Sequence, residues 1–242
     1  GEHYPPVVRF ALAELAAELE VVAAVFVGGT EKVDAGASEA VYGVPVVSGP
    51  TAEAALAEAI RHHAPEVIVD LSDEPVLSAT DRMALAGVAL GLGVAYRGAD
   101  FRFDPPRRDA LTATPTLAVI GTGKRVGKTA VSAHVARYLK SAGRDIVVLA
   151  MGRGGPAEPE LIRGDQVALT TDDLLALARE GVHASSDNYE DAVMSRVTTV
   201  GSRRCGGGLA GDTFFGNVRE GARLADSLGK DLIVLEGSGA AI

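Results

Sequence analysis

Several residue types are scarce in this sequence, and each scarcity excludes a class of protein. Of the 242 residues, one is cysteine, none is tryptophan and 5% are aromatic. The lone cysteine, Cys205, excludes an internal disulfide framework and fits a reducing compartment, so we expect a cytoplasmic protein. No apolar run approaches the roughly 18 residues that a membrane-spanning helix needs. A secretory leader is not visible either.

An excess of basic charge is also missing. The formal net charge is −9, and residues 1–115 contain 8 Lys and Arg against 17 Asp and Glu, whereas residues 116–242 contain 15 of each. This balance does not favour a nucleic-acid binder, and we expect neither nucleic-acid nor membrane partners. The basic residues of the second half are gathered among glycines, a pattern that suits a small polyanion better than a duplex.

Aliphatic residues, in contrast, are plentiful. Hydrophobic residues make up 47% of the chain and the mean hydropathy is +0.18, which is enough to build a sizeable core. A chain of 242 residues is long for one compact domain and comfortable for two. The sequence opens at "GEHYPPVVRF" without Met and stops after "LEGSGAAI", so we expect a piece of a longer protein.

The first half alternates strand and helix patterns. The run "VVAAVFVGG" is β-branched and ends in glycines, as buried parallel strands do. Thr51 is placed to cap a helix that follows it. Strands separated by helices of this length predict βαβ units. Strands are expected at 21–29, 41–47, 66–72 and 94–98, helices at 51–63 and 79–93, and a linker at 101–115.

The second half repeats the alternation. Its helix near 171 begins at Thr170 or Thr171, and its strands are short and aliphatic. Two α/β domains in tandem are therefore expected, at 1–110 and 111–242, the second incomplete at its C-terminal end. Here strands are expected at 115–121, 145–152, 196–201 and 231–237, and helices at 127–142, 171–181 and 217–229.

The stretch "GTGKRVGKTAVSAHVARYL" has the features of a phosphate-binding loop that leads into a helix. Glycines let backbone N–H groups curl round phosphate oxygens at the positive end of a helix. In such a loop Lys128 lies along the β- and γ-phosphates, and the Thr129 hydroxyl ligates Mg²⁺. The nucleotide-binding residues predicted from this pattern are Gly121, Gly123, Gly127, Lys128, Thr129 and Ala130.

The spacing of this loop is irregular, because Thr122 occupies the place of the first glycine. "GTGKRVGKT" resembles "GTDTxVGKT", the loop of dethiobiotin synthetase and its relatives in the deviant P-loop group. Those enzymes place "VEGAGG" after a later strand, and this sequence has "LEGSGAA" in the same relative position. The resemblance implies that Glu236 is a Mg²⁺ ligand; the alternative is an ordinary acidic residue at the end of a strand.

Three further segments narrow the resemblance: "AMGRGGPAEPE" at 150–160, "HASSDNYEDA" at 183–192 and "GSRRCGGGLAG" at 201–211. Together with the loop, they resemble the cyclic 2,3-diphosphoglycerate synthetase family over nearly the whole chain. The resemblance implies a Rossmann-like α/β N-terminal domain and a deviant P-loop NTPase α/β domain with a mostly parallel sheet. It also implies a ligase that uses ATP and Mg²⁺ to close 2,3-diphosphoglycerate into a ring, and a homodimer.

Such a reaction brings two polyanions together, and this requires several cations. Catalytic contact with the transferring phosphoryl group is assigned to Lys124, Arg125 and Lys128. Substrate binding is assigned to Arg153, His183, Asp187, Arg203 and Arg204, which the glycine-rich turns would bring to the anions. Each has a plainer reading: the arginines as turn or surface residues, His183 as structural, and Asp187 as a partner of a helix dipole.

Two other functions are consistent with the same residues. One is an ATP-dependent kinase or ligase that acts on another phosphorylated or carboxylated metabolite. The other is a nucleotide-switched binding protein or metallochaperone, although such proteins usually carry Cys and His clusters and this chain has one Cys and five His.

Overall fold

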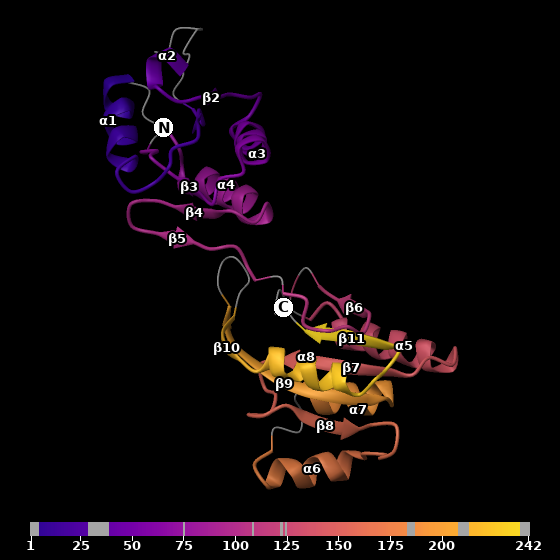
Figure 1. Cartoon of the computed structure of the whole chain (residues 1–242). Helices are drawn as coiled ribbons and strands as arrows, with labels where there is room; N and C mark the ends of the chain where they lie inside the picture. The colour runs from indigo at the N-terminus through magenta and orange to yellow at the C-terminus, as the bar shows by residue number, and fades with distance from the viewer. Residues whose placement is uncertain are drawn as a thin grey trace. The chain divides into compact units, whose positions relative to one another are not determined.

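The computed structural model describes residues 5–28, 39–74, 76–107, 109–121, 123, 125–182, 187–207 and 213–237. Contacts divide the chain into two compact units, Gly1–Pro106 and Arg107–Ile242, and each is described by itself (Figure 1). Both units alternate helices with strands, and the larger sheet is mostly parallel, as the sequence predicts. No helix in the described ranges is long and apolar enough to cross a membrane.

The first unit builds two small sheets. Strands β1 and β2 form a parallel pair, while β3 is parallel to β4 and β5 runs antiparallel to β4. Thr51 caps α3, where its side chain accepts a hydrogen bond from the Ala54 N–H. The elements are α1 (Pro5–Leu15), β1 (Ala24–Val25), α2 (Glu39–Tyr42), β2 (Val46–Val47), α3 (Ala52–His63), β3 (Val67–Val69), α4 (Ala79–Gly91), β4 (Ala95–Arg97) and β5 (Arg102–Phe103).

Two of the expectations for this unit are wrong. Residues 41–47 do not form one strand, because α2 ends at Tyr42 and β2 begins only at Val46. The segment expected as a linker at 101–115 contains β5, whose Phe103 pairs with Tyr96 of β4. The aromatic rings explain this pairing: Phe101 stacks on Tyr96 at 6.0 Å and on Phe103 at 5.4 Å between centroids.

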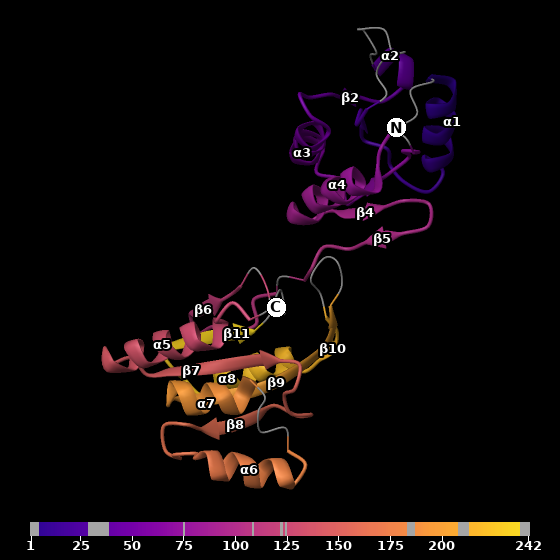
Figure 2. The same ribbon diagram turned by 180° about the vertical axis from the view of Figure 1, so that it is seen from behind.

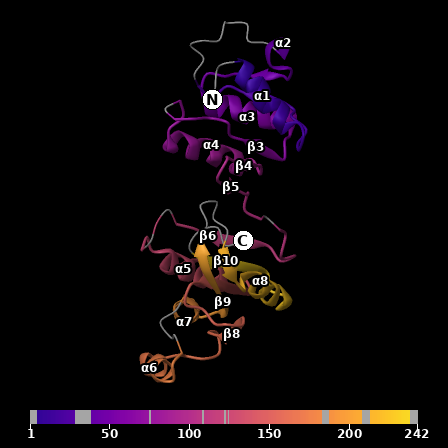
Figure 3. The same ribbon diagram turned by 90° about the vertical axis from the view of Figure 1, so that its left-hand side faces the viewer.

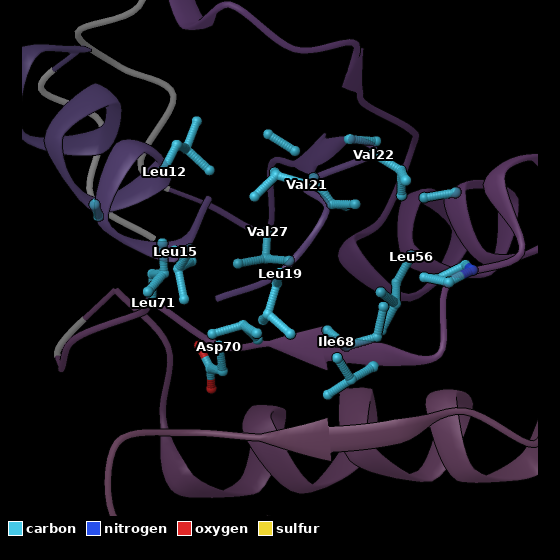
Figure 4. Close-up of a pocket in the computed structure, with 18 of the residues that line it drawn as sticks. Leu12, Leu15, Leu19, Val21, Val22, Val27, Leu56, Ile68, Asp70 and Leu71 are labelled. Carbon is cyan, nitrogen blue, oxygen red and sulfur yellow. The ribbon is translucent and has the colours of Figure 1, made fainter. Parts of the chain in front are cut away.

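A cavity of about 730 Å³ lies in this unit between α1 and the strands. Figure 4 shows its aliphatic walls, with Leu12 and Leu15 on one side and the Asp70 carboxylate as the acidic group among the labelled residues. No Lys or Arg of the described chain lines it. Because phosphates need cationic partners, this aliphatic lining does not fit a polyanion.

The second unit is built on a six-stranded sheet in the order β10-β9-β7-β11-β6, with β8 also paired to β9. The strands β9, β7, β11 and β6 are mutually parallel, and β8 and β10 run antiparallel to β9. The elements are β6 (Thr116–Val119), α5 (Lys128–Ser141), β7 (Ile146–Gly152), β8 (Glu160–Arg163), α6 (Thr171–Arg179), α7 (Asp187–Ser195), β9 (Thr198–Gly207), β10 (Thr213–Gly216), α8 (Val218–Ser227) and β11 (Leu232–Gly237).

Helices cover both faces of this sheet. Figure 3 shows α8 on one face and α5 and α7 on the other, and Figure 2 views the sheet from the α5 and α7 side. Alternation along the buried strand β7 explains this arrangement. Val147 and Leu149 pack with Ala222 of α8, whereas Val148 packs with Ala136 of α5. Complete burial of such side chains stabilises the fold by about 1.5–3 kcal/mol each.

The strand that carries the paired arginines is longer than expected. Residues 196–201 were the predicted strand, but β9 continues to Gly207, and its second half pairs with β10. Arg203 and Arg204 therefore lie on a strand and not in a glycine-rich turn, which corrects the expectation. Pairing with β10 explains the difference. Glycine has a low strand propensity, so this segment alone does not predict a strand, but hydrogen bonds to β10 satisfy its backbone groups.

Candidate functional site

The start of α5 has the geometry of an anion-binding helix end. The first helical hydrogen bond runs from the Val131 N–H to the Gly127 carbonyl at 3.0 Å, and no side chain caps this helix start. The backbone N–H groups of Lys128, Thr129 and Ala130 precede that first bond, so helix α5 itself provides them with no acceptor. Such a helix start attracts anions.

Among the described residues of the segment that leads into α5, Gly127 and Arg125 adopt the left-handed conformation. Gly127 has φ +88° and Arg125 has φ +61°. Glycine adopts such angles without a steric penalty, but a non-glycine residue does so at some cost and commonly at functional turns. Arg125 is exposed. This backbone feature of Arg125 has no signature in the sequence.

The Lys128 side chain folds back over the loop. Its Nζ donates a hydrogen bond to the Gly123 carbonyl at 3.4 Å. A Cβ added to Gly121 would lie 2.9 Å from both Cγ and Cδ of Lys128 and 2.6 Å from Val126 Cγ2. Glycine at position 121 therefore leaves the space that the lysine stem occupies, and this explains a glycine there in physical terms.

Thr129 and Glu236 meet at the carboxyl end of the parallel strands. The Thr129 hydroxyl donates to Glu236 Oε1 at 3.3 Å. Glu236 is 2% exposed and lies in β11 between Val119 of β6 and Ala150 of β7. Ligands of open α/β sheets bind outside this end of the strands. The two residues that the sequence predicts as metal ligands are thus brought together.

These two side chains fit a magnesium ion by their chemistry. Mg²⁺ prefers hard oxygen donors, and proteins usually supply one or two carboxylates while phosphates and water complete the shell. A hydroxyl and a carboxylate oxygen 3.3 Å apart at a phosphate loop suit that role. The described residues contain no group of three or more His, Cys, Asp or Glu that could hold a metal ion.

Three arginines lie just after β7 and within β9, in different environments. Arg153 follows β7 and is exposed. Arg203 is exposed too, and its Nε donates to the Gly155 carbonyl at 2.8 Å. Arg204 is only 6% exposed and its Nε donates to the Met151 carbonyl at 3.3 Å. Arg153 and Arg203 can therefore meet a ligand in solvent, whereas Arg204 is packed against β7.

Asn217 is a residue of this region that the sequence analysis does not single out. Its Oδ1 accepts from the Arg203 N–H at 2.7 Å, and its Nδ2 donates to the carbonyls of Pro156 and Ala157 at 3.2 and 2.8 Å. An Asn that precedes a helix usually suggests a cap, so the sequence offers no sign of this role.

Helix α7 carries further polar residues to the sheet. Asn188 is 2% exposed and donates to Glu160 Oε2 at 3.3 Å, while the Tyr189 hydroxyl donates to Glu160 Oε1 at 3.1 Å. Burial, and next the Glu160 carboxylate, raise the pKa of Tyr189 to about 12. A Cβ on Gly201 would lie 2.7 Å from Asn188 Cβ. These contacts fix α7 on β9 and β8, and Gly201 of β9 pairs with Ala150 of β7, which pairs in turn with Glu236 of β11.

Some predicted site residues cannot be placed. Lys124 and His183 lie outside the described residues. Asp187 begins α7, but its side chain is not among those described. Ala130 lies exposed in the first turn of α5.

Comparison with known proteins agrees with this geometry. Residues 116–242 match the family model of the cyclic 2,3-diphosphoglycerate synthetase P-loop domain, and residues 1–104 match that of its N-terminal domain. Curated relatives that carry the name cyclic 2,3-diphosphoglycerate synthetase include those of Thermococcus kodakarensis, 54% identical over 241 residues, Rubrobacter xylanophilus, 50% over 244, and Methanothermus fervidus, 46% over 252.

These matches cover 99–100% of this chain and 54–55% of each relative. The chain thus spans about half the length of the curated relatives it matches. Two adjoining family models and extensive identity lead to one conclusion: the chain belongs to the cyclic 2,3-diphosphoglycerate synthetase family.

Proposed function

We propose that this chain carries the nucleotide site and part of the substrate site of an ATP-dependent synthetase that closes 2,3-diphosphoglycerate into its cyclic form. The relatives' name supplies the substrate. The observation that carries the proposal is the contact of Thr129 with buried Glu236, beside a lysine folded over a glycine loop. That arrangement fits the γ-phosphate end of a nucleotide.

The proposed reaction has two steps. First, an oxygen of one substrate phosphate attacks the γ-phosphorus of ATP, the bond to the β-phosphate oxygen breaks, and ADP leaves. Second, an oxygen of the neighbouring substrate phosphate attacks the phosphorus that now bears the added phosphoryl group. Inorganic phosphate leaves with the electron pair of the broken bond, and the new phosphoanhydride closes the ring. ATP and 2,3-diphosphoglycerate thus give cyclic 2,3-diphosphoglycerate, ADP and phosphate.

The loop residues hold the nucleotide in this proposal. Backbone N–H groups of Gly121, Gly123, Gly127 and the first turn of α5 surround the phosphates, and Lys124, Arg125 and Lys128 neutralise the transferring group. Phosphoryl transfer leaves a protein little covalent work, so positioning and charge stabilisation supply the rate. Bound Mg²⁺ would be held by Thr129 and Glu236 and would offset the negative charge of the phosphate oxygens.

The substrate's phosphates are assigned to the arginines after β7 and on β9. The exposure of Arg153 and Arg203 supports direct contact of these side chains with the substrate's phosphates. Arg204 is hydrogen-bonded to the Met151 carbonyl of β7, and in this proposal its positive charge adds to the attraction of the phosphates. His183 and Asp187 stay in the proposal from the resemblance alone. The homodimer that the resemblance implies is also part of the proposal, and sedimentation of the full-length protein tests it.

Phosphorus NMR tests the activity. The full-length protein, incubated with ATP, Mg²⁺ and 2,3-diphosphoglycerate, should convert the two substrate phosphate signals into those of a cyclic product, with ADP and phosphate in equal amounts. ATP turnover on another phosphorylated or carboxylated acid, with no cyclic product, would replace this proposal by a kinase or ligase of different substrate. ATP turnover that depends on a protein partner would indicate a nucleotide switch.

A further inference from the structure

The backbone at Ser202 and Arg203 is unusually crowded. A Cβ on Gly155 would lie 2.0 Å from the Ser202 carbonyl oxygen, and one on Gly216 would lie 2.8 Å from the Arg203 carbonyl oxygen. Both distances are shorter than atoms tolerate, so the turn after β7 and strand β10 reach β9 only because glycine stands at each position. The turn is pressed directly onto the strand that carries Arg203.

The side chain of Asn217 closes this contact with three hydrogen bonds. It accepts from the Arg203 N–H and donates to the carbonyls of Pro156 and Ala157, at 2.7, 3.2 and 2.8 Å. A fourth bond runs from the Asn217 N–H to the Arg203 carbonyl at 3.1 Å. The Arg203 Nε then binds the Gly155 carbonyl at 2.8 Å. Asn217 therefore links the turn that begins at Arg153 to the strand that carries Arg203.

Asn217 directly precedes helix α8, and its side chain does not make the hydrogen bond that is usual at that position. It is the N-cap residue of α8, and Asn at that position ordinarily accepts a hydrogen bond from the first helical turn. Here its side chain makes no capping bond. Its three side-chain hydrogen bonds go instead to the Arg203 N–H of β9 and to the carbonyls of Pro156 and Ala157. The Asn217 amide therefore binds the turn at 156–157 and strand β9, and it does not cap helix α8.

We propose that Asn217 is a positioning residue for substrate binding, which fixes the distance between Arg153 and Arg203. An amide suits the task because one side chain must both accept from an N–H and donate to carbonyls. Two arginines that grip two phosphates need a fixed separation, since misplacement of about 1 Å can cost 100-fold in rate. This inference rests on the proposed function, in which Arg153 and Arg203 bind the substrate's phosphates.

Matched variants of the full-length protein test it. Asn217→Asp keeps an acceptor for the Arg203 N–H but points a carboxylate at two carbonyls, and Asn217→Ala removes all three bonds. Glu220→Gln, on the exposed side of the same helix, is the control. The measurements are the Kd of an ATP analogue, the KM and kcat for 2,3-diphosphoglycerate, and hydrogen exchange of the Arg203 N–H.

We expect both Asn217 variants to raise the KM for 2,3-diphosphoglycerate by about tenfold or more, while the nucleotide Kd stays within about twofold. Asn217→Ala should also speed exchange at Arg203. A KM like that of Glu220→Gln, or an equal loss of nucleotide and substrate binding, would overturn the inference. If the wild type binds nucleotide but not 2,3-diphosphoglycerate, the proposed function fails. Unchanged hydrogen exchange at Arg203 in Asn217→Ala would separately show that Asn217 does not hold this strand in place.

Discussion

The hydroxyl of Thr129 and the carboxylate of Glu236 lie 3.3 Å apart, although 107 positions separate them in the chain. Thr129 lies in the first turn of α5 and Glu236 near the end of β11, so the contact exists only because β6 and β11 are neighbours in the sheet. The pair joins the phosphate loop to the carboxyl edge of the sheet, and several predictions depend on it.

Removal of the Thr129 hydroxyl should abolish most of the activity. Thr129→Val keeps the shape but loses an oxygen ligand, and we expect kcat/KM to fall by about 100-fold or more, as for other losses of transition-state charge stabilisation. Thr129→Ser should retain most of the activity. Steady-state ATP turnover measures both, with the exposed Thr116→Val at the start of β6 as a matched control. Equal rates for the Val and Ser variants would contradict a ligand role.

Metal binding should depend on the nucleotide. The proposed site has two protein side chains, Thr129 and Glu236, as ligands, so we expect no tight Mg²⁺ binding without nucleotide and clear binding with an ATP analogue. Isothermal titration calorimetry distinguishes the two conditions. EDTA should stop turnover without shifting the unfolding temperature of the apo protein. Tight binding of Mg²⁺ to the apo protein would point to ligands beyond this pair.

Alanine at position 121 should weaken nucleotide binding more than alanine at position 123. The added methyl at 121 would overlap the Lys128 stem at 2.9 Å and Val126 at 2.6 Å, whereas at 123 the nearest contact, Val126 Cγ1, is an ordinary 3.7 Å. Displacement of the lysine should raise the nucleotide Kd by about tenfold, the loss of one charge-assisted contact. Fluorescent nucleotide titration compares the variants, and a larger effect of Gly123→Ala would refute the steric argument.

Alanine substitutions of Arg203 and Arg204 should have different effects, the first on substrate binding and the second on stability. Arg203→Ala should raise the KM for the phosphorylated substrate by about tenfold with little change in thermal stability, because its side chain is exposed. Arg204→Ala should lower stability by about 1–3 kcal/mol, because it removes a buried side chain hydrogen-bonded to Met151. Substrate titration and thermal unfolding separate the two effects. Similar profiles for both variants would argue against this division.

Low pH should lower the stability of the first unit, because it protonates the Asp70 carboxylate. Burial disfavours its charge, but hydrogen bonds from Ser72, Arg82 and Tyr96 outweigh burial and hold the pKa of Asp70 below its ordinary 3.8. A lowered folded-state pKa stabilises the fold above this ordinary, unfolded-state pKa, and the contribution is lost as the pH falls through the folded pKa.

Asp70→Asn should therefore destabilise the unit at pH 7 by about 2 kcal/mol, since the Arg82 partner at 2.7 Å loses its counter-charge. The difference between wild type and variant should shrink as the pH approaches the folded pKa. Thermal unfolding at several pH values checks this, and a constant difference would show that Asp70 acts through shape and not charge.

Much of the architecture could be predicted from local sequence. Aliphatic runs predicted the strands β7 and β11, and helix signals predicted α3, α4 and α5 to within a residue or two. The missed strands β5, β8 and β10 are two to four residues long, and each exists through a partner strand. Short segments carry too little periodicity to be recognised before their partner is known.

The sequence by itself determined the loop, its lysine and threonine, and the glutamate after the last strand, because these residues act through local backbone geometry and side-chain chemistry. Only the tertiary structure decided that Glu236 lies beside Thr129, that Arg203 is exposed while Arg204 is buried, and that Asn217 serves the strand and not its helix. Each of these depends on strand order and register, which bring together residues that are distant in the chain.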